Sequence, residues 1–257
     1  MKEQEESCSF SMGGIAVTLE EAYALLGGDA KEAAARLGSR ALLVKYLRQF
    51  PETGGVAALR AAHEAGDASA MWQAAHSLRG SCKTLGLRAL AEAAGQCMAA
   101  PEAAWPDLER AYDQAVSVIG FIEDEGGETA PDAYTFGGLR VLLVEDDYLC
   151  AMISSEMLAG MGLSVRVARD GDEAARLAKQ GGFDCVFLDA HMPDTDSVLM
   201  LKDIRRALPD APVFALTAGL LPGEEERLRA AGLRACVEKP ADAETIARLL
   251  GECFPRE

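Results

Sequence analysis

Short apolar runs, each followed at once by a polar side chain, constrain the fold of this chain more than any other feature. Four such runs lie in its second half, at 141–144, 185–188, 213–216 and 236–237. Apolar runs that alternate with helical patterns are typical of buried strands in a parallel sheet. The polar residues after the runs should then meet at the carboxyl edge of that sheet, where ligands bind. These residues are Glu145, Asp146, Asp189, Thr217 and Lys239.

The second half of the chain alternates between strand and helix patterns from residue 139 onward. Five such pairs predict a small α/β domain with a doubly wound parallel sheet over 139–257. We expect strands near 139–144, 163–168, 183–188, 212–216 and 234–237. We expect helices near 148–160, 171–180, 197–207, 223–231 and 242–253.

The first half of the chain is rich in Ala and Leu and lacks strand-like alternation, which predicts an all-helical bundle over 18–125. We expect helices near 18–26, 31–50, 55–65, 67–84 and 87–99, and a last one with an apolar seam between Trp105 and Ile122. Residues 1–17 form an N-terminal tail, and the acidic, glycine-rich stretch 126–138 is expected to be a linker. A flexible linker of ~16 residues, counted over 123–138, spans roughly 20–24 Å.

Composition excludes several classes of function. The net charge of −16 argues against a nucleic-acid partner, because binding phosphates requires clustered Lys and Arg. No apolar run approaches the ~18 residues of a membrane span, and the acidic N-terminus is no signal peptide, so we expect no membrane insertion. The seven cysteines show no C-x-x-C spacing, which favours reduced thiols in the cytoplasm over a zinc site.

The strand-end residues suit one kind of chemistry. Carboxylates that lie close together repel one another unless a cation sits among them, and Mg²⁺ (or Mn²⁺) prefers oxygen ligands of this type. Asp189 is then a candidate nucleophile that would form an aspartyl phosphate. Lys239 can neutralise phosphoryl oxygens, and the Thr217 hydroxyl can donate a hydrogen bond to one of them.

A histidine on one predicted helix of the first domain is the second candidate site. Residues 71, 75, 78, 82 and 85 form an apolar stripe, and His76 lies on a different face with Arg79, Gly80 and Lys83. The nearby cations should lower the imidazole pKa and keep His76 neutral, hence nucleophilic toward phosphorus. Arg79 and Lys83 would then stabilise the phosphoryl group.

The strand-end motifs V-L-L-V-E-D-D, F-L-D-A-H-M-P-D-T-D, A-L-T-A and V-E-K-P resemble the response-regulator receiver domain. The resemblance implies a flavodoxin-like sheet with strand order 2-1-3-4-5. It implies that Asp189 is the phosphoacceptor, Thr217 the switch hydroxyl and Lys239 the family's lysine. It assigns the metal to Glu145, Asp146, Asp189 and the backbone carbonyl of His191. Two positions depart from the family pattern, Ser197 where glycine is usual and Cys236 where an aromatic residue is usual.

The segment A-H-S-L-R-G-S-C-K-T-L-G at 75–86 resembles the signature of histidine-containing phosphotransfer (HPt) domains. The resemblance implies that His76 is the phosphorylated histidine. It also implies that Arg79, Gly80 and Lys83 stabilise the phosphoryl group. Arg79 stands where the family usually has lysine.

Together the two resemblances imply a phosphorelay protein without a kinase domain, limited to self-phosphotransfer and autodephosphorylation. Its expected partners are a sensor histidine kinase, another receiver or another HPt protein. Two alternatives stay open. In the first, phosphorylation of Asp189 switches a binding scaffold and the HPt domain is inactive. In the second, the chain is an aspartate-nucleophile phosphohydrolase. Whether His76 and Asp189 of one chain exchange phosphoryl groups is also open.

Overall fold

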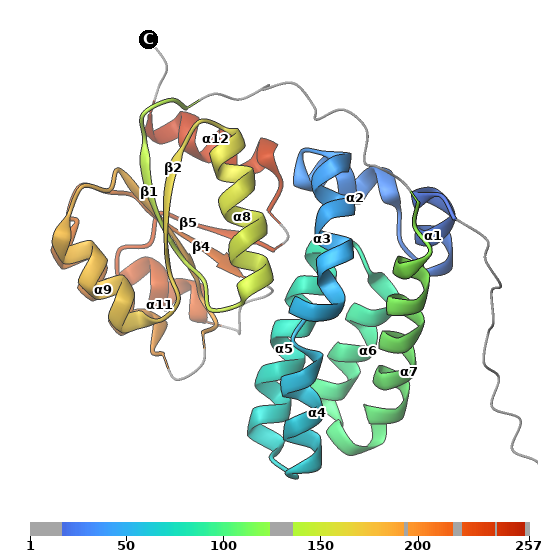
Figure 1. Ribbon diagram of the computed structural model, residues 1–257. Helices are drawn as coiled ribbons and strands as arrows, with labels where there is room; N and C mark the ends of the chain where they lie inside the picture. The colour runs from blue at the N-terminus through green and yellow to red at the C-terminus, as the bar shows by residue number, and fades with distance from the viewer. Residues whose placement is uncertain (1–16, 124–135, 193–194, 218–222, 240, 255–257) are drawn as a thin grey trace, which may run out of the picture.

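A computed structural model describes residues 17–123, 136–192, 195–217, 223–239 and 241–254. A bundle of helices lies beside a domain built on a parallel sheet (Figure 1). Nearly all of the expected N-terminal tail, 1–17, and most of the expected linker, 126–138, fall outside the described residues. Among the described helices, none combines the length and the apolar character that crossing a bilayer requires.

The helical domain contains seven helices within the described residues. They are α1 (Leu19–Leu25), α2 (Ala30–Leu37), α3 (Arg40–Thr53), α4 (Val56–Glu64), α5 (Ala68–Leu85), α6 (Arg88–Ala99) and α7 (Pro101–Gly120).

The single helix expected at 31–50 is wrong, because α2 and α3 replace it. Gly38 ends α2 in the left-handed conformation at φ 75°, which glycine adopts without steric cost. Ser39 then caps α3, its hydroxyl accepting a hydrogen bond from the Leu42 amide at 3.3 Å. The apolar pattern runs through this break, so periodicity alone did not reveal it.

Helix α5 holds His76, and its ends are well defined. The Asp67 carboxylate caps the start, and Gly86 ends the helix in the left-handed conformation at φ 73°. The expected apolar stripe is buried in the bundle core and keeps His76 on another face. Its members are Met71, Ala75, Leu78, Cys82 and Leu85.

Two residues that the sequence assigns to connecting segments pack into the domains. Val17 forms a parallel bridge with Ile122 and is buried. Phe136 is buried in the sheet domain, where its amide donates to the Met161 carbonyl at 2.7 Å. Each domain therefore recruits an apolar residue from the segment that borders it.

The second domain holds a five-stranded sheet in the order β2-β1-β3-β4-β5, and every neighbouring pair is parallel. This order confirms the expected flavodoxin-like arrangement. The strands are β1 (Arg140–Val144), β2 (Ser164–Ala168), β3 (Cys185–Asp189), β4 (Val213–Thr217) and β5 (Ala235–Glu238). The helices are α8 (Tyr148–Gly160), α9 (Gly171–Gln180), α10 (Ser197–Ala207), α11 (Glu224–Ala230) and α12 (Ala243–Cys253).

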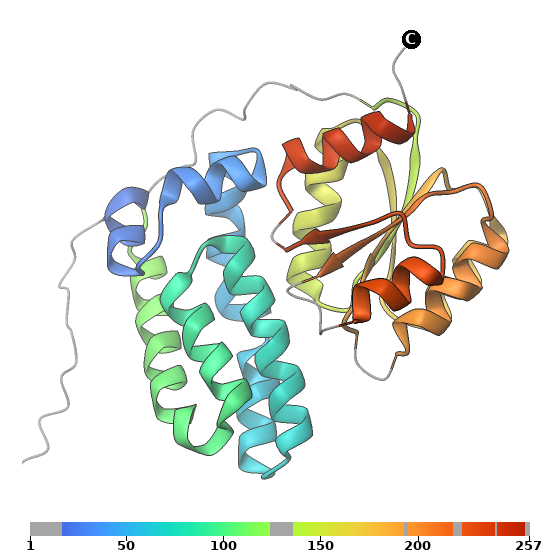
Figure 2. The ribbon, with the colours of Figure 1, turned by 180° about the vertical axis from the view of Figure 1, so that it is seen from behind.

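Helices cover both faces of the sheet, as a parallel sheet requires. Helices α8 and α12 cover one face, and α9, α10 and α11 cover the other (Figures 1 and 2). An apolar cluster lies between the sheet and each of these layers. The chain reverses its direction of winding between β1 and β3, which places the switch point at the carboxyl ends of these two strands. Helix α8 also contacts α3 and α5 of the helical domain.

The cap of α5 allows a direct test of the local stability of the histidine helix. The Asp67 carboxylate accepts hydrogen bonds from the Ser69 and Ala70 amides, both at 3.0 Å. Asp67→Ala should lower the free energy of unfolding of the helical domain by about 1 kcal/mol, measured by urea denaturation with circular dichroism. Asp67→Asn keeps a capping oxygen and should cost much less. Equal losses in the two variants would contradict a capping role.

Candidate functional site

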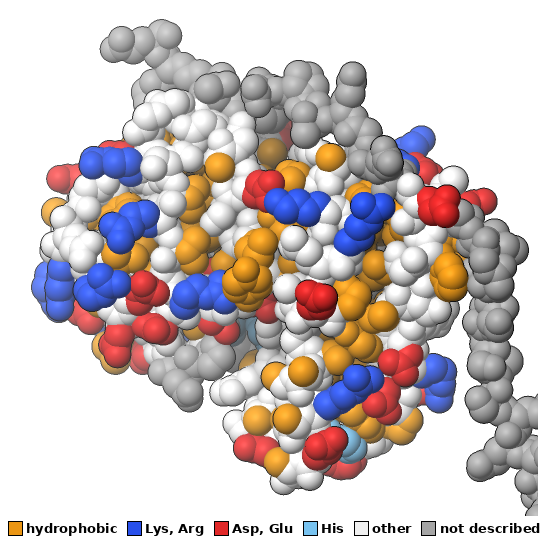
Figure 3. Space-filling model, in the orientation of Figure 1, with side chains coloured by type: hydrophobic (Ala, Val, Ile, Leu, Met, Phe, Trp, Pro, Cys, Tyr) orange, Lys and Arg blue, Asp and Glu red, His pale blue; other side chains and the backbone are white. Residues whose placement is uncertain are grey.

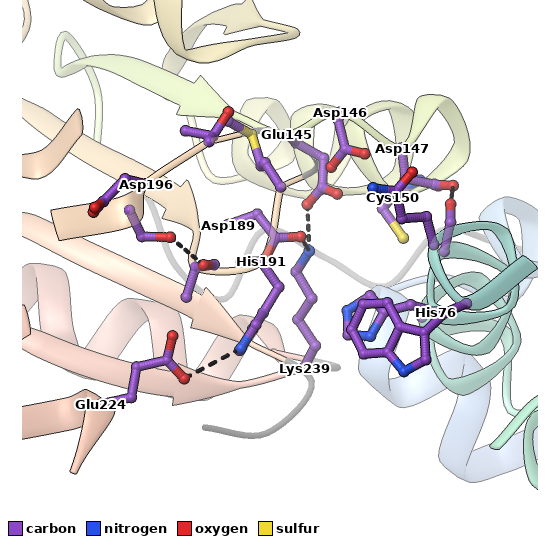
Figure 4. Close-up of a pocket in the computed structure, with 18 of the residues that line it drawn as sticks. His76, Glu145, Asp146, Asp147, Cys150, Asp189, His191, Asp196, Glu224 and Lys239 are labelled. Carbon is purple, nitrogen blue, oxygen red and sulfur yellow. Dashed lines mark hydrogen bonds and ion pairs between the residues drawn. The ribbon is translucent and has the colours of Figure 1, made fainter. Parts of the chain in front are cut away.

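The strand-end residues predicted from the sequence converge at one edge of the sheet. Glu145 and Asp146 directly follow β1, Asp189 ends β3, Thr217 ends β4 and Lys239 directly follows β5. All of them except Thr217 line a cavity of about 610 Å³, which helix α5 borders on its other side (Figure 4). The three acids each place one carboxylate oxygen within 4.8 Å of the others.

Lys239 lies between two of these acids. Its Nζ atom is 2.5 Å from Glu145 Oε2 and 2.6 Å from Asp189 Oδ2 (Figure 4). Burial alone would lower the pKa of Lys239, but the two carboxylates raise it well above its usual range. The ammonium group therefore stays charged and holds both carboxylates in place.

The three acids carry more negative charge than Lys239 can balance. Burial, together with the negative charge of Asp189, raises the pKa of Glu145 to about 8 even though Lys239 opposes the shift. Burial and the charge of Asp189 also raise the pKa of Asp146. When ionised, the three carboxylates and one ammonium carry two net negative charges, which one divalent cation would balance. The oxygen donors and the charge both fit Mg²⁺.

His191 is held on the receiver side of the cavity. Its amide donates to Asp189 Oδ1 at 2.8 Å. Its ring lies between Glu224 Oε2, 3.2 Å from Nε2 (Figure 4), and Thr217 Oγ1, 3.2 Å from Nδ1. In the neutral ring, the carboxylate of Glu224 accepts from Nε2–H, and Nδ1 accepts from the Thr217 hydroxyl. The ring is thus oriented by two partners.

His76 enters the same cavity from α5. Its ring stacks on Trp72 at a centroid distance of 5.2 Å, and it lies 5.6 Å from the His191 ring. Its Nδ1 atom is buried and has no hydrogen-bond partner among the described residues, so Nε2 is the nitrogen available for chemistry. His76 and the strand-end acids, about 70 residues or more apart in the sequence, therefore share one cavity.

The cause of the lowered His76 pKa differs from the one that the sequence suggested. Burial is the largest contribution, and the charges of Lys239 and Arg79 add to it while Asp189 opposes it. The prediction named only the cations of the same helix. The receiver domain forms one wall of the cavity around His76, which explains why burial contributes more to the lowered pKa than the cations of α5 do.

Of the three residues predicted to surround the phosphoryl group on His76, only Gly80 is among the described residues that line the cavity. Gly80 lines the cavity, and a Cβ atom there would lie 4.0 Å from the Cys150 sulfur of α8. Arg79 and Lys83 are not among the described residues that line it. The Arg79 side chain lies against α6, with Nε 3.4 Å from the place where a Cβ atom on Gly95 would be.

Sequence reasoning missed several polar residues at the site. Asp147 accepts hydrogen bonds from the hydroxyls of Ser77 and Ser81 on α5. Asp147, which also caps α8, was not among the residues predicted from the sequence. The i, i+4 spacing of the two serines could have indicated a shared face of α5. No pattern in the sequence links Glu224 to His191, because α11 approaches the site only in the folded domain.

Comparisons with known proteins agree with both halves of the fold. The family model of the Hpt domain matches residues 41–120, and that of the response regulator receiver domain matches residues 141–250. The chain is 35% identical over 126 residues to the sensor histidine kinase AruS of Pseudomonas aeruginosa, covering 48% of this chain and 13% of that protein. It is 31% identical over 139 residues to the aerobic respiration control sensor protein ArcB of Escherichia coli, covering 53% of this chain and 17% of that protein.

A solved structure with similarity to this chain is the receiver domain of the sensor histidine kinase PA1611 from Pseudomonas aeruginosa, which has a magnesium ion in its active-site cleft. It is 29% identical, with a TM-score of 0.43, and the match covers 47% of this chain and all of that one. The two family matches show an Hpt domain followed by a receiver domain. The chain therefore combines an Hpt domain and a receiver domain, and it spans less than a fifth of the length of the sensor relatives AruS and ArcB.

The protonation of His76 can be measured directly. Because its pKa is lowered in the folded protein, the ring should stay neutral below pH 6.5, where an unperturbed histidine is half protonated. An NMR titration of the ring resonances should give a midpoint below 6.5, with His76→Gln used to assign the signals. A midpoint at or above 6.5 would contradict the conclusion that burial outweighs the charge of Asp189.

Proposed function

We propose that this protein relays phosphoryl groups through His76 of the Hpt domain and Asp189 of the receiver domain. The single observation that carries this proposal is the shared cavity, where a neutral imidazole faces a cluster of carboxylates held by one lysine. Nucleophiles of both types bond readily to phosphorus. The protein would supply positioning and charge stabilisation, which is most of what phosphoryl transfer requires.

On the receiver side, the Asp189 carboxylate is the proposed nucleophile. The His191 amide and the Lys239 ammonium each hold one of its oxygens, which fixes the orientation of the carboxylate. Glu145, Asp146, Asp189 and the His191 carbonyl would hold Mg²⁺, which when bound supplies positive charge to the phosphoryl oxygens. Lys239 would provide charge on another side of the same group.

Thr217 and His191 form the proposed response to phosphorylation. The Thr217 hydroxyl donates to His191 Nδ1 in the neutral tautomer. To donate to a phosphoryl oxygen on Asp189, it would have to turn away from this ring. Glu224 accepts from Nε2–H of His191 and so keeps Nδ1 as an acceptor for the Thr217 hydroxyl. The His191–Glu224 pair therefore opposes the rotation of Thr217 toward the phosphoryl group.

On the Hpt side, the neutral His76 ring is the proposed acceptor and donor. Arg79 lowers the pKa of the ring through its charge, after the larger effect of burial. We propose that Arg79 and Lys83 act on the phosphorylated ring by moving toward it, and that Gly80 leaves room for the group.

Partners and compartment follow from this chemistry. The matched relatives AruS and ArcB carry sensor names, and they favour a sensor histidine kinase as the upstream partner. Another receiver or Hpt protein would serve as the downstream partner. A cytoplasmic location is part of the proposal, because thiols stay reduced there and the described cysteines are free.

Labelling separates the proposed relay from its alternatives. Incubation with a histidine kinase, ATP and Mg²⁺ should place acid-labile, alkali-stable label on His76 and alkali-labile label on Asp189. His76→Gln should remove the first pool and Asp189→Asn the second. Label that survives in the double variant would refute both assignments. Full relay by the His76→Gln variant would instead favour a scaffold whose Hpt domain is inactive.

The metal proposal predicts a loss of affinity in one variant. Asp146→Asn should weaken Mg²⁺ binding at least tenfold, since even residues that only support metal ligands cost 10–100-fold when changed. Calorimetric titration of Mg²⁺ measures this loss. Asp172→Asn on α9 removes an exposed acid and is the matched control. Equal affinities for the two variants would place the metal elsewhere.

A further inference from the structure

The first turn of α8 is attached to the histidine helix. Asp147 caps α8 by accepting from the Cys150 amide at 2.7 Å. The same carboxylate accepts hydrogen bonds from the hydroxyls of Ser77 and Ser81, the latter at 3.1 Å. These serines lie one turn apart on α5, and Ser77 directly follows His76. One acid therefore joins the start of a receiver helix to the segment that holds the histidine.

A second polar contact holds α8 about 13 Å farther along its axis, by the helical rise per residue. Glu156 accepts from Lys45 at 2.7 Å and from the Tyr46 hydroxyl, both on α3. The Tyr46 side chain is buried, and its hydroxyl also lies 3.2 Å from the Met152 carbonyl. The pair with Lys45 is partly exposed and contributes little, but the buried tyrosine hydroxyl needs its partners.

An apolar seam fills the space between the two polar contacts. Leu149 and Ile153, four residues apart on α8, are 0% and 5% exposed. Both belong to the apolar core of the helical domain, and neither belongs to the clusters that join α8 to the sheet. In a receiver domain alone, this apolar face of α8 would be exposed to water. The Hpt domain covers it.

This attachment directs the histidine toward the acceptor. Figure 4 shows His76 approaching the side of the cavity where Lys239 and Asp189 lie. The His76 ring is 5.6 Å from the His191 ring, and the His191 amide is bonded to Asp189. Charges of either sign are interspersed on the outer face of both domains (Figure 3), whereas the contact itself uses specific hydroxyl–carboxylate bonds.

We infer that α8 is the docking surface for the chain's own Hpt domain, and that the phosphoryl group moves in cis between Asp189 and His76. This inference rests on the proposed function of these two residues. A partner that fits this surface must supply two hydroxyls that donate to Asp147 and a tyrosine that donates to Glu156. It must also supply apolar side chains that pack on Leu149 and Ile153. Helices α3 and α5 of the same chain present all of them.

The transfer balances without any further reactant. The Nε2 lone pair of His76 forms the new N–P bond. The O–P bond to Asp189 breaks, and its electron pair returns to the carboxylate. The proton on Nδ1 stays on the ring, which becomes a protonated phosphohistidine. The reverse step restores the neutral imidazole, with its proton on Nδ1, and the aspartyl phosphate.

A complementation experiment tests the cis route with the full chain. A small labelled acyl phosphate with Mg²⁺ loads Asp189, and acid-labile, alkali-stable label on His76 reports transfer. In the wild-type chain, the rate should not change on dilution. In a mixture of His76→Gln and Asp189→Asn chains, only transfer between chains is possible. At about 10 μM each, the mixture should be roughly 100-fold slower, because tethered domains meet at an effective mM concentration.

Variants of the docking surface test its role. Ile153→Glu places a charge in the seam, at a residue that belongs to the apolar core of the helical domain, and should slow transfer in the chain toward the rate of the mixture. Loading of Asp189 should continue, which shows that the receiver is folded. Ala159→Glu adds the same charge at an exposed position of α8 and is the matched control. The double variant Ser77→Ala, Ser81→Ala keeps the cap of α8 and should slow transfer about tenfold or more.

The outcomes separate this inference from the proposed function. A wild-type rate that falls in proportion to concentration, or a mixture as fast as the wild type, would overturn the cis route while both residues still carry label. Ile153→Glu transfer as fast as that of Ala159→Glu would overturn the assignment of α8. Absence of label on Asp189 and His76 in every sample would overturn the proposed function, and the inference with it.

Discussion

Two carboxylates at the edge of one sheet share a single ammonium group, and the receiver pocket depends on that arrangement. Glu145 and Asp189 are 1% and 6% exposed, a degree of burial that costs an unpaired ion several kcal/mol. Lys239 can reach both because β5 pairs with β4, and its own amide donates to the Thr217 carbonyl at 2.6 Å. The strand order of the sheet therefore decides whether the Lys239 ammonium lies close enough to balance the charge of the two carboxylates.

Helix α8 is the second organising element, because it belongs to two cores. Met157 and Leu158 pack on the sheet, whereas Leu149 and Ile153 pack on the helical domain. A helix with one apolar face normally serves one core. The apolar residues of α8 lie on more than one side, so the helix holds the pocket and the histidine in one frame. Asp147 reinforces this frame by capping α8 and binding α5 at once.

Much of the fold followed from patterns of short range. The strands lie within two residues of their expected positions, because runs buried on both faces of a parallel sheet are continuous and easily recognised. The break between α2 and α3 was missed because Gly38 and Ser39 act only through the conformation and capping of single residues. The acids, Thr217 and Lys239 were found because parallel strands bring their carboxyl ends together. Glu224 was not found, since it reaches His191 from a helix whose position depends on the packed domain.

The sequence by itself determined two domains, the strand-end cluster and the histidine face, because each depends on periodicity or on residues close in the chain. Only the tertiary structure decided that the two sites share one cavity. It also decided that burial, more than neighbouring cations, keeps His76 neutral. Both results depend on how two separately folded domains pack together. That packing depends on side chains such as Ser81, Asp147 and Ile153, which no repeat or spacing in the sequence connects.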